Sequence, residues 1–139
     1  MRSILALILS AFALVAPLAQ EDAGRPAWQD SVSAQIEALR ADDGEAALAM
    51  AGAAFRASYT DPERFIADIK GAGYAPIAAS RSHSFGSSRT LVTGMVVQEV
   101  EFIGVDGKVW EAIYQMAEEP NEGWRVQGVI LRGTAGIGI

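Results

Sequence analysis

The chain has 139 residues, a formal net charge of −6 and no cysteine. The acidic balance and the lack of a basic cluster argue against binding to nucleic acid or to anionic membrane surfaces. Because cysteine is absent, the fold contains no disulfide, even in an oxidising compartment. A domain of this size buries about two-thirds of its unfolded surface, so the chain is long enough to fold without cross-links.

The first nineteen residues predict a secretory signal peptide. Arg2 precedes the uncharged apolar run of residues 4–15, and the segment ends in small residues up to Ala19. This order is typical of a cleavable leader, whereas a transmembrane helix needs about 20 apolar residues. We expect cleavage after Ala19, a periplasmic or secreted location and no membrane attachment afterwards. Loss of Arg2 changes the net charge from −6 to −7.

The remaining chain predicts one domain without internal repeats. Residues 20–27 are polar and are expected to form a flexible lead-in, and residues 133–139 form a glycine-rich tail. Between them, residues 28–132 predict a single α+β domain in which helices precede an antiparallel sheet.

The first helix is predicted from Pro26, because the missing N–H of proline is tolerated in the first turn. Its apolar residues recur at spacings of four, four and three, which follows one face of a helix. They are Trp28, Val32, Ile36 and Leu39.

A second helix is predicted from the acidic pair Asp42-Asp43 to about Ser58. Asp42 fits an N-cap whose reciprocal partner is Glu45, three residues later. A metal-binding or catalytic carboxylate pair is the alternative for the two aspartates.

A third helix is predicted to begin at Pro62, with Thr60 or Asp61 as its cap. Gly71 and Gly73 end it.

Two short segments follow this helix. Residues 74–79 are expected to be extended, with Pro76 limiting them to a sheet edge or a bend. Residues 81–89 have the polar composition of a loop.

The end of the domain predicts a three-stranded antiparallel meander. The strands are Thr90–Ile103, Lys108–Met116 and Trp124–Leu131, and the turns between them are residues 104–107 and 120–123. Both turns contain residues that tolerate positive φ. The apolar face of such a sheet requires a cover, which the preceding helices are expected to provide.

Alternation along the strands predicts the two faces of the sheet. The covered face holds Val96, Gln98, Val100, Phe102, Trp110, Ala112, Tyr114, Met116, Trp124, Val126 and Ile130. The outer face holds Val109, Ile113, Val129 and Leu131 together with Glu99, Glu101 and Glu111.

Several short motifs point to one known family. They are Gln35–Asp43, Phe55, Gly73–Pro76, Gln98, Trp110–Tyr114, Gly123–Gly128 and Leu131. These motifs resemble the domain of unknown function 4864 family, which consists of small and mostly exported bacterial proteins. The resemblance covers about residues 28–132 and implies that the protein is exported. In a chain of this length, helices followed by an antiparallel sheet are also similar to the nuclear transport factor 2-like cone. Relatives often carry a cysteine after the glycine that matches Gly128; this chain has Val129, so thiol chemistry is absent there.

Gln98 is a polar residue on the covered face of the predicted sheet. A buried amide without hydrogen-bond partners lowers the stability of the fold by about 1–3 kcal/mol. Gln98 therefore either bonds within the core or lines a cavity. Because cone-like folds often hold a ligand on the concave face, an apolar pocket with a few polar groups is expected there. The candidate ligand-binding residues are Tyr59, Tyr74, Gln98, Trp110 and Tyr114. The alternative is a filled core in which Gln98 is satisfied and the tryptophan is a packing anchor.

His83 is the only histidine, and Ser80, Ser82 and Ser84 lie near it in the sequence. No nucleophile elbow or pair of oxyanion donors accompanies them, so we expect a solvated loop histidine and no catalytic residue. One histidine without cysteine does not supply a zinc site, and no loop has the alternating acidic pattern of a calcium site. Neither a metal nor a cofactor is predicted.

Three functions follow from these patterns. The first is non-catalytic binding of a small apolar or amphipathic molecule, or of a protein partner, through the concave face. The second is an enzyme resembling ketosteroid isomerase or cone-fold dehydratases, with Tyr114 as the hydrogen-bond donor. However, no acidic residue of the strands is expected on the covered face, where a catalytic base would have to lie. The third is a structural or homodimeric module that pairs through the outer face of the sheet.

Overall fold

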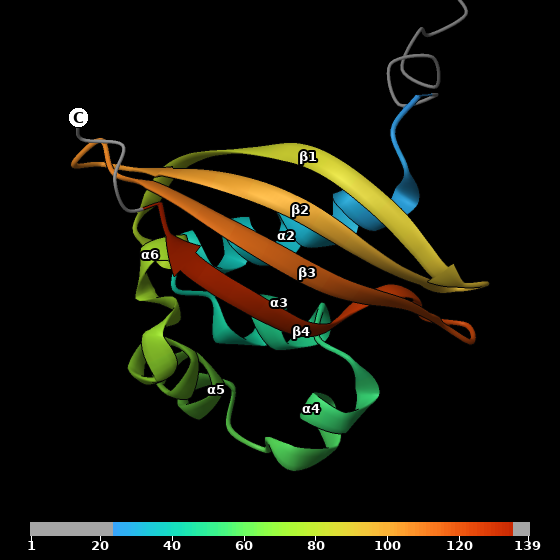
Figure 1. Cartoon of the computed structure of the whole chain (residues 1–139). Coiled ribbons are helices and arrows are strands. Elements are labelled where there is room, and N and C mark those ends of the chain that lie inside the picture. Colours follow the sequence, from blue (N-terminus) through green and yellow to red (C-terminus); the bar gives the residue numbers. More distant parts are fainter. Residues whose placement is uncertain (1–23, 135–139) are drawn as a thin grey trace, which may run out of the picture.

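The computed structural model describes residues 24–134, and these form helices followed by one antiparallel sheet (Figure 1). The helical segments are α2 (Ala27–Arg40), α3 (Gly44–Ala49), α4 (Ala53–Ser58), α5 (Pro62–Ile69), the π-helical turn η1 (Lys70–Tyr74) and α6 (Ala75–Ala78). The four strands pair in sequence order and are β1 (Ser80–Val92), β2 (Met95–Gly104), β3 (Val109–Glu119) and β4 (Gly123–Gly133). The predicted signal peptide, residues 20–23 of the lead-in and residues 135–139 of the tail lie outside the described residues.

The fold is therefore α+β, as predicted. Figure 1 shows the helices gathered on one side of a curved sheet, with α4 and α5 below its β4 edge. Within residues 24–134, no helix has the length and apolar character needed to cross a membrane.

The predicted stripe on α2 is confirmed, because Val32, Ile36 and Leu39 are buried against the sheet. Trp28 is partly buried, and its ring meets that of Trp124 edge to face at 5.3 Å. This geometry favours aromatic pairs, so the first turn of α2 is fixed on β4.

The second predicted helix is two helices, and its cap is Asp43 rather than Asp42. The Asp43 carboxylate accepts the Ala46 N–H at 3.1 Å. Asp42 has a φ of 57° and receives the Lys70 ammonium group at 3.0 Å. Asp43 therefore caps α3, and Asp42 forms an ion pair on the surface.

Residues 50–52 separate α3 from α4 because they pair with β4. The Gly52 N–H donates to the Val126 carbonyl at 2.8 Å, and the Val126 N–H donates to the Met50 carbonyl at 2.9 Å. A Cβ on Gly52 would lie 2.6 Å from Oε1 of Gln127, so a larger residue there would displace the end of the Gln127 side chain. The backbone leaves the helical path to make these bonds.

The third helix starts as predicted, with the Asp61 carboxylate accepting the Glu63 N–H at 3.0 Å and Pro62 in the first turn. The prediction of extended structure for residues 74–79 is wrong. Gly73 turns the chain with a φ of 103°, and α6 follows with Pro76 in its first turn. Proline fits a first helical turn as well as a bend, and the sequence pattern did not separate the two.

The predicted loop over residues 81–89 is also wrong, because these residues belong to β1. β1 is an edge strand of the sheet and most of its side chains are exposed. Its serines and arginines therefore give it the composition of a loop. The predicted first strand spans the end of β1, the hairpin at Gly94 with a φ of 80°, and β2.

A β-bulge in β4 changes the predicted faces. Met116 lies opposite Val126, whereas Tyr114 lies opposite Val129, so β4 contains one extra residue between them. An extra residue exchanges the faces of the side chains that follow it. Val129 and Leu131 therefore pack on the covered core, and Ile130 points outward with 67% of its surface exposed. The predicted faces of these three residues were wrong.

The Glu119 carboxylate of β3 forms hydrogen bonds and an ion pair with residues of α4. Its side chain is 15% exposed, and its Oε2 accepts the Ala53 N–H at 2.9 Å and Nε2 of Gln127 at 3.1 Å. Nη2 of Arg56 donates to Oε1 at 3.2 Å. The bond from Ala53 is the largest of several contacts that lower the pKa of Glu119 below its ordinary value.

We expect Glu119→Gln to lower the free energy of unfolding by about 1–2 kcal/mol at neutral pH. Because the folded-state pKa is lowered, the stabilisation is present above the unfolded value of 4.5 and is lost as pH falls through the folded value. In urea unfolding, the difference between the two proteins should be present near pH 7 and should narrow near pH 3. Glu118→Gln, which changes an exposed neighbour, is the matched control. An equal difference at both pH values would contradict this account.

Candidate functional site

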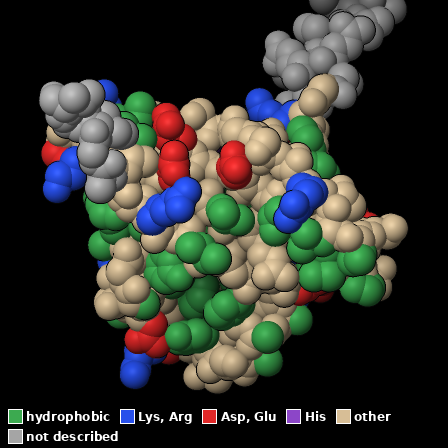
Figure 2. Space-filling model, viewed as in Figure 1, with side chains coloured by type: hydrophobic (Ala, Val, Ile, Leu, Met, Phe, Trp, Pro, Cys, Tyr) green, Lys and Arg blue, Asp and Glu red, His purple; other side chains and the backbone are tan. Residues whose placement is uncertain are grey.

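An apolar cavity of about 260 Å³ lies between the helices and the strands β3 and β4. Its lining includes Leu39, Phe65, Ile69, Ile77, Val126 and Val129. Phe55 of α4 also contacts the cavity and remains 37% exposed, which places it at the entrance. Figure 2 shows hydrophobic side chains gathered on this face between the sheet and the lower helices. The cavity is therefore apolar and opens to the surface beside Phe55.

Three polar side chains line this cavity, and they come from α2, η1 and β3. The Tyr74 hydroxyl donates to the Val129 carbonyl at 2.7 Å, which joins η1 to β4. Nε2 of Gln35 donates to the Ala47 carbonyl at 3.1 Å.

Tyr114 differs from these two residues. It is 1% exposed, and its hydroxyl makes no hydrogen bond with any residue in the described range. Burial raises the pKa of Tyr114 well above its ordinary value, so the phenol stays a neutral donor. A ligand or water in the cavity would supply the hydrogen-bond partner that the described residues do not.

Gln98 is completely buried but does not belong to this cavity. Its Oε1 accepts Trp28 Nε1 at 2.8 Å and Gln29 Nε2 at 3.2 Å. Its Nε2 donates to the carbonyls of Gly86 at 3.0 Å and Ser87 at 3.3 Å, at an irregularity in β1. All its polar atoms are thus bonded, so Gln98 joins α2 to the edge strand.

The other predicted site residues are divided among different places. Tyr74 and Tyr114 share the cavity, as the candidate set required. The Tyr59 hydroxyl donates to Asp68 at 2.7 Å on the surface, and this bond raises the pKa of Tyr59. Trp110 lines a separate hollow with Pro76 beside α6.

Gln35 was missed as a site residue, although the sequence held a signal for it. It lies three residues after Val32 and four before Leu39, which places it on the buried face of α2. Phe65 and Ile69 also line the cavity, and no sequence pattern indicated that they face one.

His83 belongs to a polar network between β1 and α2. Nη2 of Arg40 donates to Nδ1 of His83 at 3.2 Å and to Oγ of Ser80 at 3.0 Å. Because arginine only donates, the ring hydrogen is on Nε2, which donates to Oγ of Ser33 at 3.0 Å. Burial, followed by the charge of Arg40, lowers the pKa of His83. With this tautomer, His83 does not accept the proton of Ser33 and does not activate it as a nucleophile.

A family model described as "Domain of unknown function (DUF4864)" matches residues 10–138. The match covers more than half of the chain. The chain belongs to the DUF4864 family. The comparison with curated proteins gave no match. The family resemblance read from the sequence motifs is therefore confirmed.

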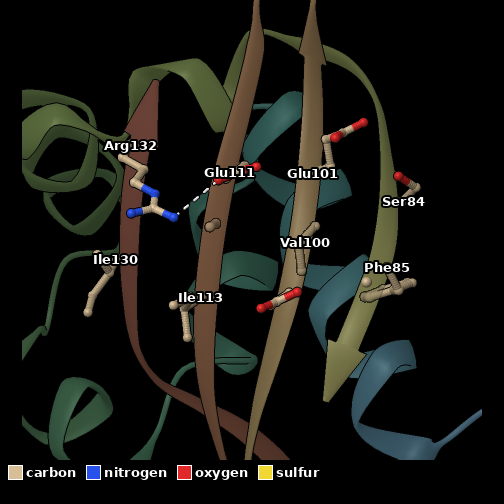
Figure 3. A pocket seen from close by; sticks show the side chains of 11 residues that line it. Ser84, Phe85, Val100, Glu101, Glu111, Ile113, Ile130 and Arg132 are labelled. Carbon is tan, nitrogen blue, oxygen red and sulfur yellow. Dashed lines mark hydrogen bonds and ion pairs between the residues drawn. The ribbon is translucent and has the colours of Figure 1, made fainter. Parts of the chain in front are cut away.

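The outer face of the DUF4864 sheet carries a second hollow, of about 270 Å³ (Figure 3). Ile113 and Ile130 lie opposite each other in β3 and β4 and are 41% and 67% exposed. Glu101 and Glu111 lie opposite each other in β2 and β3, and Nη2 of Arg132 donates to Glu111 at 3.3 Å. The prediction that Glu101 and Glu111 lie outside the helical cover is confirmed.

The described residues contain no group of three or more acidic, histidine or cysteine side chains arranged for a metal ion. The homodimer through this face of the DUF4864 domain stays a prediction. Ile113 lies on this face as expected, and Ile130 takes the place of Val129 and Leu131 there. Sedimentation velocity tests the homodimer, since a monomer at high protein concentration would exclude it.

Proposed function

We propose that this DUF4864 chain is an exported domain that binds a small apolar molecule in the cavity beneath β3 and β4. The observation that carries the proposal is Tyr114, a buried residue that lines an apolar space and whose hydroxyl has no partner among the described residues. Pockets that bind small molecules are mostly apolar with a few placed polar groups. The volume of about 260 Å³ is below that of a pocket for a drug-sized ligand, so the ligand is small.

The curvature of the sheet and the helices on its concave side support the same proposal. We take this arrangement to be a cone of the nuclear transport factor 2-like kind, in which the ligand lies between the helices and the sheet. The predicted signal peptide, with cleavage after Ala19, directs this binding to the periplasm or the exterior.

The enzyme alternative has less support from the cavity. Proton transfer there needs a base close to the donor. Tyr114 supplies a donor, but the described lining residues include no carboxylate or imidazole. Binding without catalysis is therefore the function that we propose.

Thermal unfolding with 1-octanol as a probe tests this proposal. A ligand that binds only the folded state stabilises it by about 2.7 kcal/mol at one hundred times its Kd. For a domain of this size, we expect the unfolding midpoint to rise by roughly 10 °C. No rise, together with no heat of binding in calorimetry, would contradict the proposed function.

A further inference from the structure

The polar atoms of the cavity restrict the chemistry of its ligand. The Tyr74 hydroxyl and the Gln35 amide nitrogen are already bonded to the carbonyls of Val129 and Ala47. The Tyr114 hydroxyl and Oε1 of Gln35 have no hydrogen-bond partner within residues 24–134, although the two side chains are 1% and 5% exposed. The Tyr114 hydroxyl can thus donate to a ligand, and Oε1 of Gln35 can accept from one.

These two atoms are not sealed in the packed core. Among the described residues, the one fully enclosed side-chain atom without a partner is Nε of Arg125. The Tyr114 and Gln35 oxygens are therefore not fully enclosed, and both residues line the cavity. A molecule in this space can contact both of them.

The cavity offers no counter-charge to an ionic ligand. Its described lining consists of apolar side chains, glycine, glutamine and tyrosine, with no arginine, lysine, aspartate or glutamate. Transfer of an unpaired ion from water into such a space costs several kcal/mol. A carboxylate could not donate to Oε1 of Gln35, and an ammonium group could donate to both oxygens but would find no counter-charge.

We propose that the ligand is a small uncharged alcohol or phenol on an apolar frame. Its hydroxyl accepts the hydrogen bond of Tyr114 and donates to Oε1 of Gln35, so both free positions are completed. A ketone or ether accepts from Tyr114 but leaves Oε1 of Gln35 without a donor. This assignment rests on the proposed function, and it names the head group that the cavity selects.

A series of probes with one hydrocarbon chain tests the assignment by calorimetry on the purified protein. The probes are 1-octanol, octyl methyl ether, octanoate and octylammonium. We expect 1-octanol to bind about tenfold more tightly than the ether and at least about a hundredfold more tightly than either ion. Octanoate or octylammonium binding as tightly as 1-octanol would overturn the assignment and leave ligand binding intact. No binding by any of the four would overturn the proposed function itself.

Two tyrosine variants locate the effect within the cavity. Tyr114→Phe should weaken 1-octanol binding about tenfold, because it removes the free donor and retains the ring. Tyr59→Phe is the matched control, because it removes a tyrosine hydroxyl that is bonded to Asp68 outside the cavity, and it should leave 1-octanol binding unchanged. Equal binding of 1-octanol by Tyr114→Phe and the unaltered protein would overturn the assignment. The probe series on the unaltered protein decides the question if a variant does not fold.

Discussion

Gln98→Leu should lower the free energy of unfolding by about 3–4 kcal/mol, which is a large fraction of the stability of a small domain. The substitution leaves Nε1 of the partly buried Trp28 without its 2.8 Å partner and two β1 carbonyls without their donor. Each buried polar group that loses its partner costs about 1–3 kcal/mol. Because the amide joins α2 to the edge strand, we expect both to loosen together.

Urea unfolding, followed by tryptophan fluorescence and by circular dichroism, measures this change. Gln115→Leu is the matched control, because Gln115 lies on the neighbouring strand β3 with its side chain exposed on the outer face. We expect that control to change the free energy of unfolding by less than about 0.5 kcal/mol. Equal losses in the two variants would show that the bonds of Gln98 are not a main source of stability.

Val129→Phe should weaken the binding of 1-octanol about a hundredfold, which corresponds to about 2.7 kcal/mol. Val129 lines the cavity and lies opposite Tyr114 in the sheet, so the larger ring occupies the space of the ligand. Overpacking of a filled core costs about 1–3 kcal/mol. Here the ring enters a cavity, and we expect the free energy of unfolding to change by less than about 1 kcal/mol.

Val97→Phe provides the matched control for this substitution. Val97 pairs with the exposed Gln115 and therefore lies on the outer face of the sheet. The same change of side chain at that position should leave the affinity for 1-octanol unaltered. Unchanged affinity in Val129→Phe, measured by calorimetry, would place the ligand outside the cavity.

The sequence predicted those parts of the fold that depend on a regular period. The stripe on α2 and the alternation of Val96, Gln98 and Val100 were correct because each element keeps its period throughout. The faces of Val129 and Ile130 were wrong because one inserted residue reverses the alternation. A bulge of this kind leaves little mark on the sequence.

The candidate site was predicted in part for a similar reason. The alternation of side chains along a strand indicated the face on which a residue lies, but not its position along that face. Trp110 and Tyr114 were both expected on the covered face of β3. Four residues along a strand correspond to about 13 Å, and of the two only Tyr114 lines the cavity. The partners of Gln98 also escaped prediction, because β1 was taken for a loop and its carbonyls were not expected nearby.

A crystal structure of the protein grown with 1-octanol tests the central claim most directly. The account predicts an octanol molecule in the cavity between the helices and β3–β4, with its oxygen about 2.7–2.8 Å from the Tyr114 hydroxyl and its chain against Phe65 and Ile69. A cavity closed by side chains, or octanol bound only on the outer face of the sheet, would contradict it.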